Sequence, residues 1–557
     1  MKPGIYKGKG KGFDWIKPVE VEVEVDEKSI KNINIVDFKN TRETKPYLKS
    51  VEDCMIPRII ESQSLKVDAI CGATMSSSGV KGAVRDALKQ ASAAGGDPEE
   101  YKKFNKDLKK KTDVIELKYD VVVAGLAGAG MAAAISAAEQ MKKAERPVSV
   151  LGLETSGKIG TMPAEIFGIN PKRYCDKYNG GKPYFDDPEE LYDYWVNEYN
   201  HGVCKPELLR LLFDESGETL DWLEFDHGCY MHSAMKGFGE CKWLCKYRFQ
   251  LGSGWEDGHV YEGLQRNWDR YEAMDFYYRR LTDDFVKLGG EYMLETTVYE
   301  LLYDKDRRKV TGVKARRYDG TEYIIHADVV VSCTGGFHGN PDMMEKYLSD
   351  EYYPFKSREW HLYGMGQNKG QLIQSAIDNG AATYNIGMSP LIHLKAPAGF
   401  INKYPYQIRE NPKTHAKELW SVNDVACSIG CQEMGIRISK NGRRTHNEGG
   451  TFAFWTAGPT WYSICGTDYL NQIAEKGFEG PEGGLSRSAR INCYGGVPNN
   501  MPVPGDLSSG TAPPPPKRPR MRAGSEYGEQ VWNSRISKNP RSRRATVTTR
   551  RAARASG

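Results

Sequence analysis

The residues with the clearest chemical potential lie together between positions 68 and 79. Their polar and small members are Asp68, Gly72, Ala73, Thr74 and Ser76. Small residues let a phosphate approach the backbone, and hydroxyl groups and the amides of a following helix can hold it. The alternative is a plain helix start in which Ser76 to Ser78 cap the apolar run 80–88. Capping explains the serines but not the acid or the Gly-Ala-Thr sequence, so the pattern favours a phosphate site.

A second chemical pattern follows an apolar run at 119–124 and precedes a predicted helix at 131–138. The turn between them consists of small residues, namely Gly125, Ala127, Gly128, Ala129 and Gly130 around Leu126. Such a turn lets a pyrophosphate approach the backbone at a helix N-terminus. Glu154 ends the next apolar run, 148–153, and suits a ribose hydroxyl. The alternative is an ordinary βαβ unit with a charged strand end, but the arrangement favours a dinucleotide site.

The elements that must position these residues fall into two parts. Residues 19–25 and 30–36 alternate between apolar and polar side chains, which predicts two strands; with the helix after Ser78 they form a small α+β unit. We place its end near residue 96. Beyond it, strands alternate with helical patterns, which is typical of an α/β fold with a parallel sheet. Residues 170–285 interrupt that pattern as an inserted region, either a cap over a bound ring or a plain lobe.

Length and composition set the broad class. The chain has 557 residues, of which 39% are hydrophobic, and this suits two or three globular domains. No stretch reaches the roughly 18 apolar residues of a membrane helix, and no signal peptide is apparent, so we expect no transmembrane segment and a cytoplasmic protein. The twelve cysteines have irregular spacing, which favours reduced structural thiols and no metal site.

The last 53 residues differ from the rest in charge and composition. Residues 505–557 hold twelve Lys/Arg against three Asp/Glu, so the net charge of +4 hides an acidic body. The segment has few apolar residues and no period, which predicts a disordered basic tail. It could serve as an arm for an acidic partner or be an unconstrained extension. We favour the second interpretation and expect no nucleic-acid partner.

The first pattern resembles the flavin attachment sequence of the FMN-binding domain of quinone reductase subunits, electron-transport complexes and some fumarate-reductase-like enzymes. Residues 68–76 match Asp-x-x-(Ser/Thr)-Gly-Ala-Thr-x-Ser, except that Cys71 stands where serine or threonine is usual. The resemblance implies that Thr74 carries covalent FMN through a phosphoester made by a flavin transferase. It identifies residues 1–95 as an FMN-binding domain, followed by a linker at 96–117.

The body resembles the FAD-dependent fumarate-reductase and succinate-dehydrogenase flavoprotein family, in its soluble flavocytochrome-like branch. The resemblance covers about residues 118–450 and rests on the segments 157–161, 295–298, 310–313, 328–337 and 436–448. It implies a Rossmann-like domain over 118–504 with an inserted cap, holding noncovalent FAD. Besides the turn at 125–130 and Glu154, the implied cofactor contacts are Thr155, Gly160, Thr161, Val298, Thr334, Gly335 and Gly336.

The resemblance also implies a reaction. Members of this family reduce an activated carbon–carbon double bond, with FAD as the hydride source and an acid as the proton source. Phe452 stands where fumarate-reducing members have an arginine proton donor, so an enone or a larger unsaturated acid suits the chain better than fumarate. The aromatic residues of this region also suit a larger, more apolar acceptor, although they could equally belong to the core; they are Phe452, Phe454, Trp455, Trp461 and Tyr462. The candidate proton donors are Tyr462, His393 and Arg444, although each could instead be a structural residue.

Two flavins on one chain imply an electron path. Electrons would pass from an external donor to FMN, then to FAD, and then to a small-molecule acceptor. No second nucleotide-binding turn is apparent, which indicates that the donor lies outside the chain. The family's glycine-rich closing segment has no counterpart after residue 504. A catalytically silent flavoprotein fragment, or an electron carrier that uses only FMN, is therefore the alternative function.

Overall fold

The computed structural model describes sixteen segments of the chain. They are residues 1–12, 18–36, 45–160, 165–199, 204–229, 231–238, 241–249, 267–304, 306, 309–348, 366–387, 407–410, 417–420, 435–439, 442–444 and 461–468. The described residues up to 387, together with 417–419, belong to one compact unit, and the others belong to a second unit. The basic tail lies outside the described residues.

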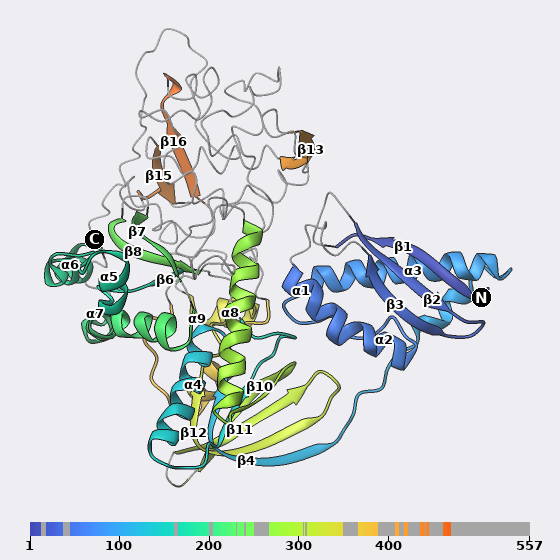
Figure 1. The fold of residues 1–557 in the computed structure, drawn as a ribbon, viewed down its shortest axis with the longest axis horizontal. Coiled ribbons are helices and arrows are strands. Elements are labelled where there is room, and N and C mark those ends of the chain that lie inside the picture. The colour runs from blue at the N-terminus through green and yellow to red at the C-terminus, as the bar shows by residue number, and fades with distance from the viewer. Residues whose placement is uncertain are drawn as a thin grey trace, which may run out of the picture. The chain divides into compact units, whose positions relative to one another are not determined.

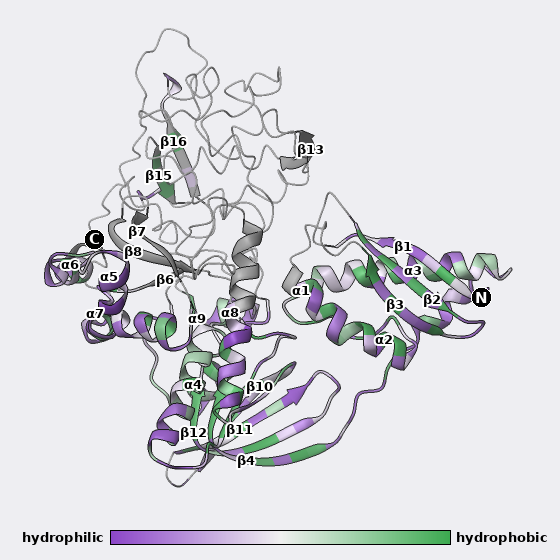
Figure 2. Ribbon diagram, in the orientation of Figure 1, coloured by the Kyte–Doolittle hydropathy of each residue, from purple (hydrophilic) through white to green (hydrophobic). Residues whose placement is uncertain are grey.

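The N-terminal part is a three-stranded antiparallel sheet covered by helices. The sheet has the order β1-β2-β3, with β1 at Gly4–Gly10, β2 at Val19–Val25 and β3 at Ile30–Val36. The helices are α1 (Lys45–Ser50), η1 (Val51–Met55), α2 (Ile56–Ser62) and α3 (Thr74–Ala94). The valines of β2 are buried and its glutamates are more exposed. Figure 2 shows hydrophobic and hydrophilic residues alternating along this strand. The strands predicted at 19–25 and 30–36 are confirmed.

Helix α3 packs directly on β1 because both carry glycine at the contact. A Cβ atom on Gly10 would lie 2.0 Å from the carbonyl oxygen of Gly79, so no larger residue fits there without moving the helix. The helix begins at Thr74 with Ala73 as its N-cap, and no side chain caps it. The serines at 76 to 78 therefore lie inside the helix, and the interpretation of these serines as caps was wrong.

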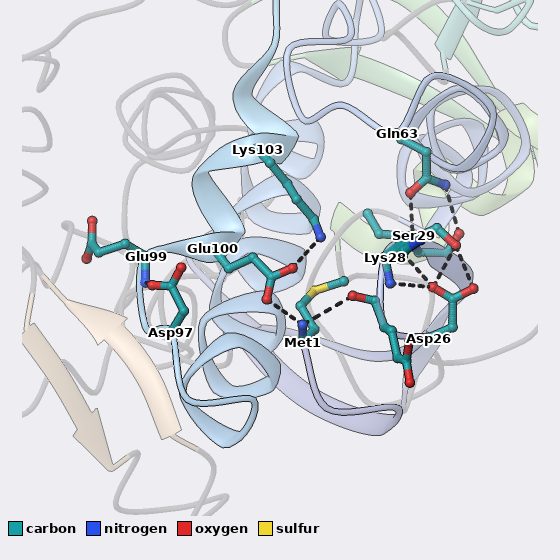
Figure 3. A network of polar contacts seen from close by, with 11 residues as sticks. Met1, Asp26, Lys28, Ser29, Gln63, Asp97, Glu99, Glu100 and Lys103 are labelled. Atoms are coloured by element: carbon teal, nitrogen blue, oxygen red, sulfur yellow. Dashed lines mark hydrogen bonds and ion pairs between the residues drawn. The ribbon is translucent and has the colours of Figure 1, made fainter.

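The first core extends into the predicted linker. Residues Glu100–Asn105 form the 3₁₀ helix η2, and Phe104 is buried against the first core. Figure 3 shows the amino group of Met1 bound to Glu100, which also accepts a hydrogen bond of 2.5 Å from Lys103. The first strand of the second part already begins at Val114. Residues 96–117 thus include a packed helical turn and the start of a strand.

The second part is built on a six-stranded sheet of order β10-β11-β12-β4-β5-β9. The strands are β4 (Val114–Ala124), β5 (Val150–Leu153), β9 (Glu291–Met293), β10 (Thr296–Asp304), β11 (Lys309–Arg317) and β12 (Glu322–Ser332). Strands β12, β4, β5 and β9 are parallel, while β10 and β11 form an antiparallel hairpin joined to β12. The predicted parallel α/β sheet is therefore present, with an antiparallel edge.

Two helices cover one face of this sheet. They are α4 (Gly128–Lys143) and α8 (Asn267–Lys287), which run beside each other in Figure 1 and share one core. On the opposite face, residues of β4, β5, β10, β11 and β12 form another core, which includes Leu372 of α11 (Gln371–Asp378). Because Phe285 and its neighbours on α8 are part of this core, the end of the predicted inserted region belongs to the sheet domain itself.

The remaining elements lie between β5 and α8 or after β12. The insertion contains β6 (Glu165–Phe167), α5 (Lys172–Tyr178), α6 (Pro188–Tyr194), η3 (Trp195–Tyr199), α7 (Pro206–Asp221), η4 (Trp222–Asp226), β7 (Met231–Phe238) and β8 (Cys241–Phe249). After β12 come α9 (Pro341–Tyr347), β13 (Gln407–Glu410), β14 (Lys417–Trp420), β15 (Gly435–Ser439) and β16 (Trp461–Cys465). In the described part of the chain, no helix is both long and apolar enough to cross a membrane.

Candidate functional site

Three turns meet at the carboxyl edge of the parallel sheet. Ala124, the last residue of β4, pairs with Leu153 at the end of β5 and with Ser332 at the end of β12. The turns at 125–130, 154–160 and 333–336 therefore start side by side. Strand β4 lies between β5 and β12, which is the position at which open α/β sheets bind ligands.

The turn after β4 has the backbone geometry that the sequence predicted. Gly125 has φ +89°, and a Cβ atom there would lie 2.4 Å from the carbonyl oxygen of Cys333. A Cβ on Gly130 would lie 1.7 Å from the carbonyl oxygen of Gly125, so glycine is needed at both positions. Ala127 is the N-cap of α4, and no side chain caps the helix there. Gly128 and Ala129 are exposed, so the N-terminus of α4 is open to an anion.

Glu154 connects two of the turns. Its carboxylate is buried and accepts hydrogen bonds from the backbone N–H of Leu126 at 2.8 Å and of Ser156 at 2.9 Å. Each carboxylate oxygen thus holds the backbone of one neighbouring turn in place. Glu154 also ends β5, which is where the sequence predicts the acid that binds the ribose. A contact between Glu154 and a ribose stays a prediction.

The other predicted cofactor contacts have different environments. Gly335 has φ +73° and is exposed beside Asn368. In the same turn, Thr334 and Gly336 are half-buried. The hydroxyl groups of Thr155 and Thr297 share a hydrogen bond. Gly160 has φ +144°, as a tight turn requires of a glycine. Val298 of β10 is buried in the core. Thr161 lies outside the described residues.

The predicted attachment segment is a short turn followed directly by a long helix. Thr74 is the first residue of α3 and is exposed, as are Asp68 and Gly72; the latter has φ +84°. Ser76 is buried within the helix, and Ser77 accepts a hydrogen bond of 3.0 Å from the N–H of Ile70, which fixes the turn. A hydroxyl on an open helix start is accessible to a modifying enzyme and lies beside backbone amides that can bind phosphate.

This segment contacts the turn after β5 within the same compact unit. A Cβ atom on Gly157 would lie 2.4 Å from Cγ2 of Ile70, and one on Gly72 would lie 3.6 Å from Cβ of Ser156. Burial, and next the charge of Glu154, raise the pKa of the Cys71 thiol. The predicted FMN segment and the predicted FAD turns are therefore neighbours.

A charged contact holds the two regions together, and sequence reasoning missed it. Arg58 of α2 forms a two-pronged ion pair with the buried carboxylate of Glu295, one hydrogen bond of which measures 2.9 Å. The Arg58 guanidinium lies 3.5 Å from the centre of the Tyr318 ring. The backbone N–H of Glu295 donates to Ser156, so the ion pair reaches the turn after Glu154. Neither Arg58 nor Tyr318 lies in a recognisable motif.

Two candidate proton donors flank one strand of the second unit. Ile438 of β15 pairs with Tyr462 of β16 and forms a bridge to Arg444. Directly paired residues point to the same face, so Tyr462 and Arg444 share a face, separated by one strand. Tyr462 is half-buried and Arg444 is exposed. His393 and the aromatic residues at 452, 454 and 455 lie outside the described residues.

Comparisons with known proteins find both kinds of flavin-binding domain in this chain. Residues 14–89 match the FMN-binding domain family, and residues 177–393 match the FAD binding domain family. The second match begins after the glycine turn at 125–130. The chain is 28% identical over 332 residues to an NADH:fumarate oxidoreductase of Klebsiella pneumoniae, with 58% of this chain and 31% of that protein covered.

Two further relatives are reductases of other compounds. A vinyl phenol reductase of Lactiplantibacillus plantarum is 26% identical over 373 residues, which cover 64% of each chain. A urocanate reductase of Eggerthella lenta is 27% identical over 341 residues, covering 61% of this chain and 50% of that one. The alignments thus span between 31% and 64% of the relatives' lengths.

The chain combines an FMN-binding domain with an FAD-binding domain of the oxidoreductase type. It is similar to flavoprotein reductases, among them fumarate-reductase-like enzymes. The residues in place fit both groups, because the glycine turn leaves room for a phosphate at an open helix start and Thr74 exposes a hydroxyl at another. In the described part of the chain, no cluster of side chains is suited to a metal ion.

Proposed function

We propose that this chain is a reductase of activated carbon–carbon double bonds, with an enone or an unsaturated acid other than fumarate as the acceptor. Bound flavin would supply the electron and hydride transfer. The chain's own residues would attach FMN at Thr74, hold FAD at the turns after β4, β5 and β12, and take electrons from an external donor. The observation that carries the proposal is the contact between the Ile70–Gly72 turn and the Ser156–Gly157 turn, which brings the two predicted flavin sites together.

The acceptor class is inferred from the relatives and from the aromatic residues of the C-terminal half. The named relatives act on fumarate, a vinyl phenol and urocanate, so the family accepts substrates of different sizes. Phe452 stands in place of the arginine expected of a fumarate reductase. Tyr462 and Arg444 remain the described candidates for the proton donor.

The first test separates the two flavins chemically. The full chain is produced in a host that has the flavin transferase, and the protein is then precipitated with acid. We expect one flavin to remain with the pellet and FAD to appear in the supernatant. Thr74→Val should remove the pellet flavin completely and leave the released FAD unchanged. Ser78→Ala, which deletes an exposed hydroxyl on the same helix, is the matched control and should change neither.

The second test measures turnover. Reduced viologen oxidation is followed with cinnamate-like acids, enones, urocanate and fumarate as acceptors. We expect an enone or a larger unsaturated acid to exceed fumarate in kcat/KM. A protein that is fully loaded with FAD but reduces none of these acceptors would contradict the reductase proposal, and a preference for fumarate would contradict the acceptor class.

A further inference from the structure

One buried tyrosine from a distant part of the sequence reaches both glycine turns. Tyr278 lies on α8, and its hydroxyl oxygen is 3.3 Å from the position that a Cβ atom on Gly128 would occupy. Two atoms of its ring lie 3.6 and 3.7 Å from the corresponding position on Gly160. The same side chain therefore supports the turn after Glu154 and places its hydroxyl at the first residue of α4.

The Tyr278 hydroxyl has no hydrogen-bond partner among the described residues, although the side chain is only 6% exposed. Buried phenols normally have a partner, because an unsatisfied hydroxyl loses its hydration. Tyr299 of the same domain has such a partner, because its hydroxyl donates to Glu322 at 2.9 Å. The Tyr278 hydroxyl is therefore available to an external group at the start of α4.

The surroundings define the charge of that group. The N-terminus of α4, a helix of 16 residues with no side-chain cap, carries partial positive charge and free donor directions. The Lys158 ammonium lies 3.2 Å from the Cβ position on Gly160 and 5.0 Å from the centre of the Tyr47 ring. Burial raises the pKa of Tyr278 far above that of an ordinary phenol, so its hydroxyl remains a donor at neutral pH. A helix start, a phenol and an ammonium together suit a phosphate anion.

We propose that Tyr278 is a cofactor-binding residue whose hydroxyl donates a hydrogen bond to the pyrophosphate of FAD at the N-terminus of α4. Lys158 contributes positive charge from the adjacent turn. The inference rests on the proposed FAD site and adds a contact from α8, outside the strand, turn and helix that the glycine pattern defines.

The test compares Tyr278→Phe with Tyr299→Phe in the full chain after noncovalent flavin has been removed. Both variants delete one phenolic oxygen, but only the first oxygen faces the turn. Calorimetry with FAD, ADP and adenosine as ligands should show that Tyr278→Phe weakens FAD and ADP binding by roughly tenfold to a hundredfold, as for a hydrogen bond to a charged group. Adenosine lacks phosphate, so its affinity should not change, and Tyr299→Phe should bind all three normally.

The outcomes separate this inference from the proposed function. If the unaltered chain does not bind FAD, the proposed function fails. If it binds FAD but Tyr278→Phe binds FAD and ADP equally well, or loses adenosine affinity to the same extent, the role of the Tyr278 hydroxyl is overturned. The covalent flavin content and the unfolding midpoint of Tyr278→Phe should match those of the unaltered chain. If the variant does not fold, Gly128→Ala, whose methyl would crowd the hydroxyl, should weaken ADP but not adenosine; unchanged ADP affinity would overturn the inference.

Discussion

The two predicted flavin regions are built in opposite ways. The attachment segment, residues 68–74, is contiguous, partly exposed, and needs only a hydroxyl at the start of α3 that an enzyme can modify. The cradle at the sheet edge has no reactive group of its own and depends on three turns that follow β4, β5 and β12. A covalent site can therefore be specified locally, whereas a noncovalent site must be specified by the whole fold.

The largest effect is expected from a methyl group in the glycine turn after β4. In Gly130→Ala the new carbon would meet the carbonyl oxygen of Gly125, a backbone atom that cannot move without opening the turn. We expect released FAD to fall below detection, while covalent flavin on Thr74 is unaffected. The measurement is flavin in the pellet and in the supernatant after acid precipitation.

Gly82→Ala in α3 is the matched control for that substitution. Its Cβ position has only Gly10 Cα nearby, at 3.4 Å, which is an ordinary contact. Alanine is the better helix former, so Gly82→Ala should leave both flavins in place and raise the unfolding free energy by up to ~1 kcal/mol. If the Gly130→Ala variant still retains FAD, the turn at 125–130 does not define the FAD site.

A smaller effect is expected where the two regions meet. Arg58→Ala would leave the buried carboxylate of Glu295 without its partner and remove the guanidinium from the Tyr318 ring. We expect the unfolding free energy to fall by about 3 kcal/mol in urea titrations, because an uncompensated buried charge is costly. Arg58→Lys should lower the unfolding free energy by less, because lysine keeps the positive charge but cannot form the two-pronged ion pair.

The exposed pairs of Lys49 with Glu52 and Asp53 provide the comparison for Arg58. Lys49→Ala should lower the unfolding free energy by less than about 1 kcal/mol, because water and salt screen exposed ion pairs. If Arg58→Ala and Lys49→Ala lower the unfolding free energy by the same amount, the contact between the two regions does not form in solution.

The same contrast explains what could be predicted from the sequence. Residues 68–74 form one local motif, and the alternating residues of β2 predict a strand with a buried face, so both could be identified without a structure. The glycine turn and Glu154 belong to one βαβ unit and were also predicted. Arg58, Tyr318 and Tyr278 could not be, because each acts on a residue far away in the chain and none has a local pattern. A buried tyrosine on α8 has the same sequence signal whether its hydroxyl is bonded or not.

The boundaries show the same limit. The start of α3 was placed at the serines, but the helix begins at Thr74 because Ser77 bonds back to Ile70 and extends the ordered backbone. The predicted inserted region includes α8, because an aromatic-rich helix that covers a sheet has the same composition as one in a separate lobe. Packing, and not composition, decides between these alternatives.

The smallest expected effect is a dependence of FAD retention on pH that covalent FMN should not share. His338 follows the Gly335–Gly336 turn, and burial lowers its pKa, so the folded cradle disfavours the charged ring. As the pH falls through about 6.5, His338 takes up a proton in the unfolded chain before it does so in the folded chain. The stability that the neutral His338 ring contributes is therefore present above that pH and is lost below it. We expect FAD retention to decrease as the pH falls from 7 to 5. His338→Gln should flatten this decrease, and the first 113 residues contain no histidine that would produce one at Thr74. An unchanged pH profile in His338→Gln would show that another group at the cradle titrates.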